Sequence, residues 1–122
     1  MPYFLDTYAI IEFVNGNKNY VKYFKHKNIT TKLCLMELYY KYLRELGKKW
    51  AEKVYTKFLV FVVEFDDDTM KEAMEFRLKM RRNGKKFSYT DAIGYIVAKK
   101  NKVKFLTGDR EFRNLPNVKF VK

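Results

Sequence analysis

Residues 87–112 constrain the fold most, because they predict a helix that leads directly into a short buried strand. Ser88 and Asp91 have the spacing of a capping box, which marks the start of a helix. The strand, Val103 to Leu106, is apolar with interleaved lysine, and Asp109 lies just past its end. One carboxylate therefore lies at a helix start and another at the carboxyl end of a strand, where ligands bind in open α/β sheets. Each acid also has a purely structural interpretation, Asp91 as a capping residue and Asp109 as a turn residue.

A third acidic residue follows a strand near the N-terminus. Asp6 ends the strand predicted at Tyr3 to Leu5, and Thr7 can cap a helix that continues to about Val14. A carboxylate at the end of this strand repeats the arrangement predicted for Asp109.

A fourth acidic residue lies within a helix that Thr31 can cap. A stripe of apolar residues at helical spacing predicts the buried face of this helix: Leu33, Met36, Tyr40 and Leu43. Glu37 lies on this stripe, where a carboxylate is costly unless it is paired or binds a cation. An ion pair with Lys41, four residues further on, is the structural alternative.

The rest of the chain alternates helical and strand patterns. A helix at residues 49–58 precedes a continuous apolar run, Leu59 to Val63, which is typical of a strand buried on both faces. Asp66, Asp67 and Asp68 then begin a helix that continues to about Arg82, with a capping box starting at Thr69. Shorter elements are predicted as a helix at 19–24 and strands at 29–30 and 118–121. This alternation predicts an α/β fold with a mostly parallel central sheet covered by helices on both faces.

Four stretches together resemble the PIN-domain ribonucleases, and most closely the VapC-type toxins of toxin–antitoxin pairs. They are the apolar strand into Asp6-Thr7, "ME-L" at Glu37, "SYTDA" around Asp91 and "LTGDREF" around Asp109. The resemblance implies a three-layer α/β/α PIN-like fold, and the length of the chain predicts that residues 1–122 form a single domain. It also implies the activity of a metal-dependent endoribonuclease that hydrolyses RNA phosphodiester bonds, as the toxin of a VapBC-type pair.

The resemblance further implies which residues form the site. Asp6, Asp91 and Asp109 would hold the metal directly or through water, and Glu37 would orient a water or a second ion. Ligands that are all oxygen favour a hard cation, Mg²⁺ or Mn²⁺. Additional candidates are Glu111, which matches an acid often present in the last motif, and Thr7 and Thr107, which could hydrogen-bond the carboxylates or a substrate phosphate.

The formal net charge of +12 favours a polyanionic partner such as RNA. A basic turn directly precedes the helix of Asp91. The candidate RNA-binding residues are Arg81, Arg82, Lys85, Lys86 and Arg110. Solvated surface charge, without any role in RNA binding, is the alternative for each of them.

Other catalytic classes fit the sequence less well. His26 is the only histidine, which excludes His-rich zinc sites and leaves no Ser-His-Asp triad unless His26 serves. The five glycines are isolated, so no phosphate-cradling loop is present.

The sequence also carries expectations about compartment and partners. Cys34 is the only cysteine, which excludes an internal disulfide and fits a reducing cytoplasm. No signal peptide and no membrane span are expected. VapC-type proteins usually form homodimers and bind a small antitoxin protein, so the resemblance implies both partners. The competing hypothesis is a non-catalytic basic PIN-like module that binds RNA or a protein without cutting.

Overall fold

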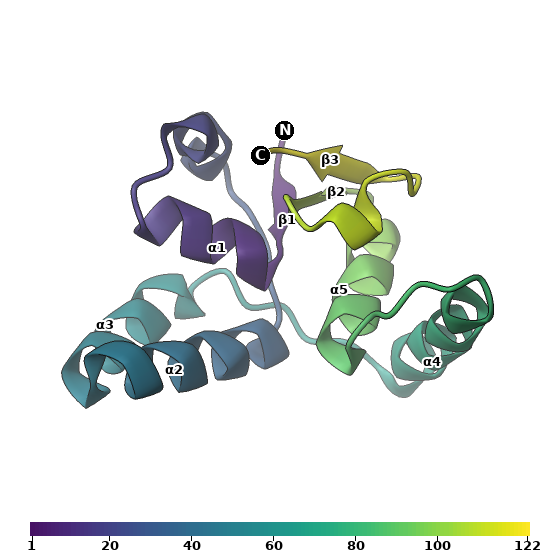
Figure 1. The fold of residues 1–122 in the computed structure, drawn as a ribbon, viewed down its shortest axis with the longest axis horizontal. Helices are drawn as coiled ribbons and strands as arrows, with labels where there is room; N and C mark the ends of the chain where they lie inside the picture. Colours follow the sequence, from purple (N-terminus) through teal and green to yellow (C-terminus); the bar gives the residue numbers. More distant parts are fainter.

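The computed structural model describes residues 1–122 (Figure 1). The helices and strands follow one another along the chain as β1 (Tyr3–Leu5), α1 (Thr7–Val14), the 3₁₀ helix η1 (Lys18–Lys25), α2 (Lys32–Leu46), α3 (Lys48–Leu59), α4 (Asp67–Arg82), α5 (Tyr89–Lys100), β2 (Lys104–Thr107), the 3₁₀ helix η2 (Arg110–Phe112) and β3 (Val118–Phe120). None of the helices combines the length and the apolar character that a membrane crossing requires.

The central sheet is parallel throughout and has the strand order β1-β2-β3. Phe4 pairs with Phe105, and Phe105 pairs with Val118, which aligns the carboxyl ends of the strands at one edge. Isolated parallel bridges, Phe4 to Ile29 and Thr30 to Val62, extend this pairing on the other side of β1. The predicted parallel sheet is confirmed, and the strand predicted at residues 29–30 is reduced to these bridges.

Alternation along β1 and β2 divides the core into two halves, one on each face of the sheet. Phe4 and Phe105 belong to the half that packs against α4 and α5, and their rings stack with centroids 5.4 Å apart. Leu5 and Leu106 belong to the other half, with residues of α1, η1, α2 and α3. Adjacent strand residues point to opposite faces, so each strand serves both halves. Figure 1 shows α2 and α3 on one side of the sheet and α4 and α5 on the other, which confirms the three-layer α/β/α fold.

Helix starts follow the local sequence closely. Ser88 caps α5, and the predicted capping box with Asp91 is complete. The aspartate run begins α4 as expected, but Asp66 rather than Thr69 is its N-cap. The Asp66 carboxylate accepts hydrogen bonds from the Thr69 N–H at 2.9 Å and the Thr69 hydroxyl at 2.7 Å. Aspartate and threonine are both favourable N-cap residues. Asp66 has the extended backbone of an N-cap, whereas Thr69 lies within the first turn of α4.

The buried strand predicted at Leu59 to Val63 is wrong. Leu59 is the last residue of α3, and Val60 is 79% exposed in the turn that follows. Val62 alone forms a β-bridge, to Thr30. A short apolar run fits a helix end as well as a strand, because periodicity does not separate the two.

The buried face predicted for α2 is also wrong. The residues that α2 buries are Cys34, Leu35, Leu38 and Tyr42. The predicted positions Met36, Tyr40 and Leu43 are exposed, and we call these three residues the outer stripe of α2. Helical spacing selects either of two interleaved apolar stripes here, and only the packing of α2 against α1 and α3 decides between them.

Gly108 provides a test of how tightly the end of β2 is packed. A Cβ atom at this position would lie 2.5 Å from the Val121 carbonyl oxygen and 2.8 Å from the Tyr20 hydroxyl, and would overlap the ring of Tyr8. We expect Gly108→Ala to reduce the free energy of unfolding by about 1–3 kcal/mol, as overpacking does. Urea denaturation measures the change.

The control for this test is Gly84→Asn. Gly84 has a positive φ of 84°, and a Cβ atom added to it would have no other atom within 4 Å. Asparagine tolerates this left-handed backbone better than most residues, so the loss of stability should be smaller than that of Gly108→Ala. Equal denaturation midpoints for Gly108→Ala and the wild type would contradict the tight packing.

Candidate active site

Asp6 lies at the junction of β1 and α1, where it is the N-cap of α1 and only 3% exposed. One carboxylate oxygen, Oδ1, accepts a hydrogen bond from the Thr7 N–H at 2.9 Å. The other, Oδ2, accepts one from the Thr107 hydroxyl at 2.7 Å. Thr107 ends β2, so the parallel pairing of β1 and β2 brings these two residues together.

Asp109 follows β2 and is the N-cap of η2. Its N–H donates to the Thr107 hydroxyl oxygen at 3.0 Å, and its carboxylate accepts from the Glu111 N–H at 3.0 Å. The Thr107 hydroxyl therefore links the Asp6 carboxylate to the backbone of Asp109. Asp109 is a turn residue, as its structural interpretation predicted, and it also lies at this edge of the sheet.

Asp91 is held at the first turn of α5 by the capping box. Its carboxylate accepts from the Ser88 N–H at 3.1 Å, and its own N–H donates to the Ser88 hydroxyl at 3.0 Å. The capping function accounts for one carboxylate oxygen, Oδ2, and the other makes no hydrogen bond to the protein.

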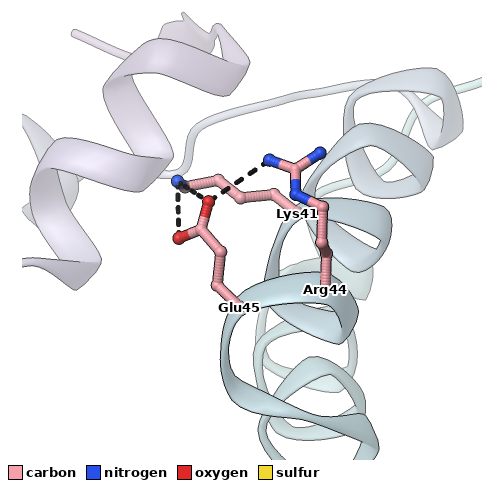
Figure 2. Close-up of polar contacts among 3 residues, drawn as sticks. All are labelled: Lys41, Arg44 and Glu45. Atoms are coloured by element: carbon pink, nitrogen blue, oxygen red, sulfur yellow. Dashed lines mark hydrogen bonds and ion pairs between the residues drawn. The ribbon is translucent and has the colours of Figure 1, made fainter.

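Glu37 joins these residues through Thr7. The Thr7 hydroxyl donates to the Glu37 carboxylate at 2.9 Å, across the junction of α1 and α2. The alternative ion pair with Lys41 does not form, because the Lys41 ammonium instead contacts Glu45 at 2.8 Å (Figure 2). Arg44 contacts the same Glu45 carboxylate at 3.3 Å. Glu37 is half-buried and without a cationic partner, rather than core-facing as the stripe predicted.

The pKa values of two of these carboxylates, Asp6 and Asp91, are raised in part by the charges of neighbouring acids. Burial raises the pKa of Asp6 to about 8, and the charges of Asp91 and Asp109 contribute, while hydrogen bonds from Thr107 and Thr7 oppose the shift. Burial raises the pKa of Asp91 to about 6; the Ser88 hydrogen bonds oppose this, and the charges of Glu37 and Asp109 add to it. Like charges in a partly buried site disfavour full ionisation unless a cation offsets them.

The donor set fits a hard divalent cation. Every candidate ligand is a carboxylate or hydroxyl oxygen, and no histidine or cysteine is among them. No three acidic, histidine or cysteine side chains are close enough to form a ready coordination group. An open set of oxygens suits Mg²⁺, which keeps several of its waters and binds proteins through one or two carboxylates.

The other predicted site residues lie in different surroundings. The Glu111 side chain makes no hydrogen bond or ion pair, although its carbonyl accepts from the Lys85 ammonium at 3.1 Å. Lys85 lines a cavity together with Arg81 and Lys86. Arg82 and Arg110 are exposed and do not line it.

Sequence reasoning missed Arg77, which also lines this cavity. Its spacing of four residues from Arg81 would have placed the two on the same face of a helix. The aromatic residue Tyr89, over which the Arg77 guanidinium lies, carries no comparable sequence signal.

Comparison with known proteins identifies one matching family and several solved structures of similar fold. The PIN domain family matches residues 3–118. No curated protein matches the chain. The fold is similar to that of DNA-bound VapBC from Salmonella typhimurium, with 21% identity, a TM-score of 0.76, and 99% of this chain and 98% of that chain covered. It is also similar to that of VapC20 from Mycobacterium tuberculosis, a Sarcin-Ricin loop cleaving toxin, with 20% identity, a TM-score of 0.74, and 98% of this chain and 96% of that chain covered. A toxin-antitoxin complex from Klebsiella pneumoniae has 15% identity and a TM-score of 0.75, with 96% of this chain and 95% of that chain covered.

The pKa of Asp6 predicts how stability depends on pH when chelator removes divalent ions. The folded protein binds the Asp6 proton more tightly than the unfolded chain, because the pKa rises from 3.8 to about 8 on folding. The free energy of unfolding should therefore fall as pH rises through this window. Asp6→Asn should reduce the total fall in the free energy of unfolding over this pH window by more than about 1 kcal/mol, since one pKa unit corresponds to about 1.4 kcal/mol. Urea denaturation at a series of pH values measures both proteins.

Asp66→Asn is the matched control for this measurement. Hydrogen bonds from Thr69 lower the pKa of Asp66, so its contribution to stability is lost as pH falls rather than as pH rises. In this variant, the free energy of unfolding should fall toward pH 8 as it does in the wild type. If Asp6→Asn showed the same fall, the buried carboxylate would not be its cause.

Proposed function

Because the chain belongs to the PIN-domain family, we propose that it is a metal-dependent endoribonuclease that hydrolyses RNA phosphodiester bonds, and the toxin of a VapBC-type toxin–antitoxin pair. The observation that carries this proposal is that carboxylates from four separate elements lie near one another at the carboxyl edge of the sheet, although no three of them form a ready coordination group. Asp6 and Asp91 each respond to the charge of neighbouring acids, and Thr7 and Thr107 connect Glu37, Asp6 and the Asp109 loop. Burying Asp6 beside partly buried acids is costly, and binding a cation is what would offset the cost.

Each residue has a distinct role in the proposal. Asp6, Asp91 and Asp109 would hold Mg²⁺ or Mn²⁺ directly or through water, and Glu37 would orient a water molecule or a second ion. When bound, the ion supplies Lewis-acid polarisation of the phosphate and a lowered pKa for water. The Thr107 hydroxyl fixes the orientation of Asp6, and the Thr7 hydroxyl fixes that of Glu37. Glu111 remains a candidate for an additional ligand on the loop of Asp109.

RNA is the proposed substrate because of the charge around this site. The chain carries a net charge of +12, and a basic turn lies between α4 and the helix of Asp91. Lys85 binds the carbonyl of Glu111, which places part of that turn beside the loop of Asp109. Cations of this kind attract the backbone of a single strand toward an acidic centre that would otherwise repel it. Arg82 and Arg110, both exposed, would contribute to this attraction at longer range.

Protein partners complete the proposal, namely a second copy of the chain and a small antitoxin. The outer stripe of α2 faces a groove of about 630 Å³ between α2 and α3, lined mostly by apolar side chains. Exposed apolar surface of this kind favours protein contact. A toxin of this type acts on cellular RNA, so the cytoplasm is the proposed location and residues 1–122 the proposed single functional domain.

The alternative is a PIN-domain module that binds RNA or protein without cleaving. The two hypotheses differ in the need for a divalent ion. Incubation of labelled RNAs with Mn²⁺, with Mg²⁺ and with chelator separates them, since the proposal requires cleavage that chelator abolishes. Binding that persists in chelator without cleavage under any condition favours the module.

Asp91→Asn and Glu37→Gln should each reduce RNA cleavage by about 100-fold or more, because small errors in placing the reacting groups have effects of that order. Both changes keep the side-chain shape, so thermal unfolding should show folded proteins. Asp68→Asn, an exposed position in the first turn of α4, is the control with the same change of charge. Cleavage by Asp91→Asn at the rate of this control would contradict the assigned role.

A further inference from the structure

A cavity of about 280 Å³ lies between the end of α4 and the start of α5. Its lining consists of Arg77, Arg81, Lys85, Lys86, Phe87 and Ser88. Four of the six residues are cationic, none is acidic, and none of the four forms an ion pair. Concentrating unpaired positive charge is unfavourable by itself and favours binding of an anion.

Hydrogen bonds from two of these cations hold the cavity in shape. The Arg77 Nε–H donates to the Phe87 carbonyl at 2.8 Å, which leaves the other guanidinium N–H groups without a hydrogen-bond partner in the protein. The Lys85 ammonium donates to the Glu111 carbonyl. Arg77 is therefore oriented before any ligand arrives, which suits recognition of a phosphate by its planar fork.

The cavity adjoins the carboxylate site through one residue. Ser88 lines the cavity and also forms the capping box that fixes the Asp91 carboxylate. A strand of RNA with one phosphate among the carboxylates would therefore meet the cations at a flanking position. The cations offset the repulsion between an anionic strand and the acids next to them.

Tyr89, next to Ser88, is an aromatic side chain that the core does not use. It is 61% exposed and has no aromatic neighbour. The guanidinium carbon of Arg77 lies 4.3 Å from the centre of its ring. A ring that is oriented on one side and open on the other is the platform on which unpaired bases stack.

We propose that this cavity binds the backbone phosphate of a nucleotide flanking the scissile bond of single-stranded RNA, and that Tyr89 stacks on the base of that nucleotide. Arg77 serves both parts, since it lines the phosphate cavity and orients the ring. This inference rests on the proposed ribonuclease function and specifies how its substrate is aligned. Stacking accepts every base, so the subsite sets the position of the strand rather than its sequence.

Binding measured in chelator tests the subsite without cleavage. The probe is a short fluorescently labelled oligouridylate, and anisotropy gives its affinity for the full chain. Tyr89→Ala should weaken binding about tenfold, and Tyr89→Phe should bind like the wild type, because stacking requires the ring and not the hydroxyl. Thermal unfolding verifies that the variants are folded. Equal loss in both variants, or in neither, overturns the stacking.

The cations are tested by the dependence of affinity on salt. Arg81→Gln combined with Lys86→Gln should lower the slope of log affinity against log salt by roughly 0.7, the contribution of one phosphate contact on a single strand. The matched control is Lys48→Gln combined with Lys49→Gln, which removes the same charge from the start of α3 on the other side of the sheet (Figure 1). An equal change of slope in both double variants shows general charge attraction and overturns the phosphate site.

Failure of this inference is distinct from failure of the proposed function. If the wild type cleaves RNA with Mn²⁺ while Tyr89→Ala and the Arg81/Lys86 variant bind RNA unchanged, the subsite is wrong and the ribonuclease assignment stands. If those variants lose affinity as expected but no RNA is cleaved with any divalent ion, the subsite stands in a protein that only binds RNA. Unchanged affinity with an unchanged salt slope shows that RNA does not use the cavity and overturns the proposal.

Discussion

The site depends on one buried carboxylate, that of Asp6, at the end of the central strand pair. Two hydrogen bonds hold it, one from the N–H that begins α1 and one from the hydroxyl that ends β2. The first is local to the start of α1, and the second is available only because β1 and β2 run parallel in a fixed register. A shift of one residue would remove Thr107 from Asp6 and would also turn Leu5 and Leu106 toward the wrong half of the core. Packing of the apolar core and orientation of the acid are therefore specified by the same strand pairing.

Structural features that depend on residues close together in the sequence were predicted well. The capping box of Ser88 and Asp91 lies within four residues, and the aspartates that begin α4 favour a helix start whatever surrounds them. Asp6 and Asp109 could be assigned to one edge of the sheet because each follows a strand and the strands are parallel. Their roles as metal ligands stay predictions.

Other features depend on contacts between distant residues, and here sequence reasoning failed. The two apolar stripes of α2 have equivalent spacing, and the choice between Leu35 and Met36 as core residues is made by α1 and α3. The run from Leu59 to Val63 suits a strand by composition, but Val54 and Phe58 continue the buried face of α3 up to its end. The cavity of Arg77 and Lys86 needs the end of one helix and the start of the next to be placed in space, which the basic turn alone does not reveal.

The hydrogen bond between Asp6 and Thr107 spans 101 positions of the chain. β1 is the first strand to be synthesised, and its partner β2 comes near the end. Contacts between residues so far apart in the sequence form slowly, and they cannot form until the later segment has been synthesised. During translation, Asp6 is therefore present long before Thr107, whose hydroxyl binds its carboxylate. A growing chain therefore cannot form the hydrogen bond between Asp6 and Thr107 until β2 has been synthesised.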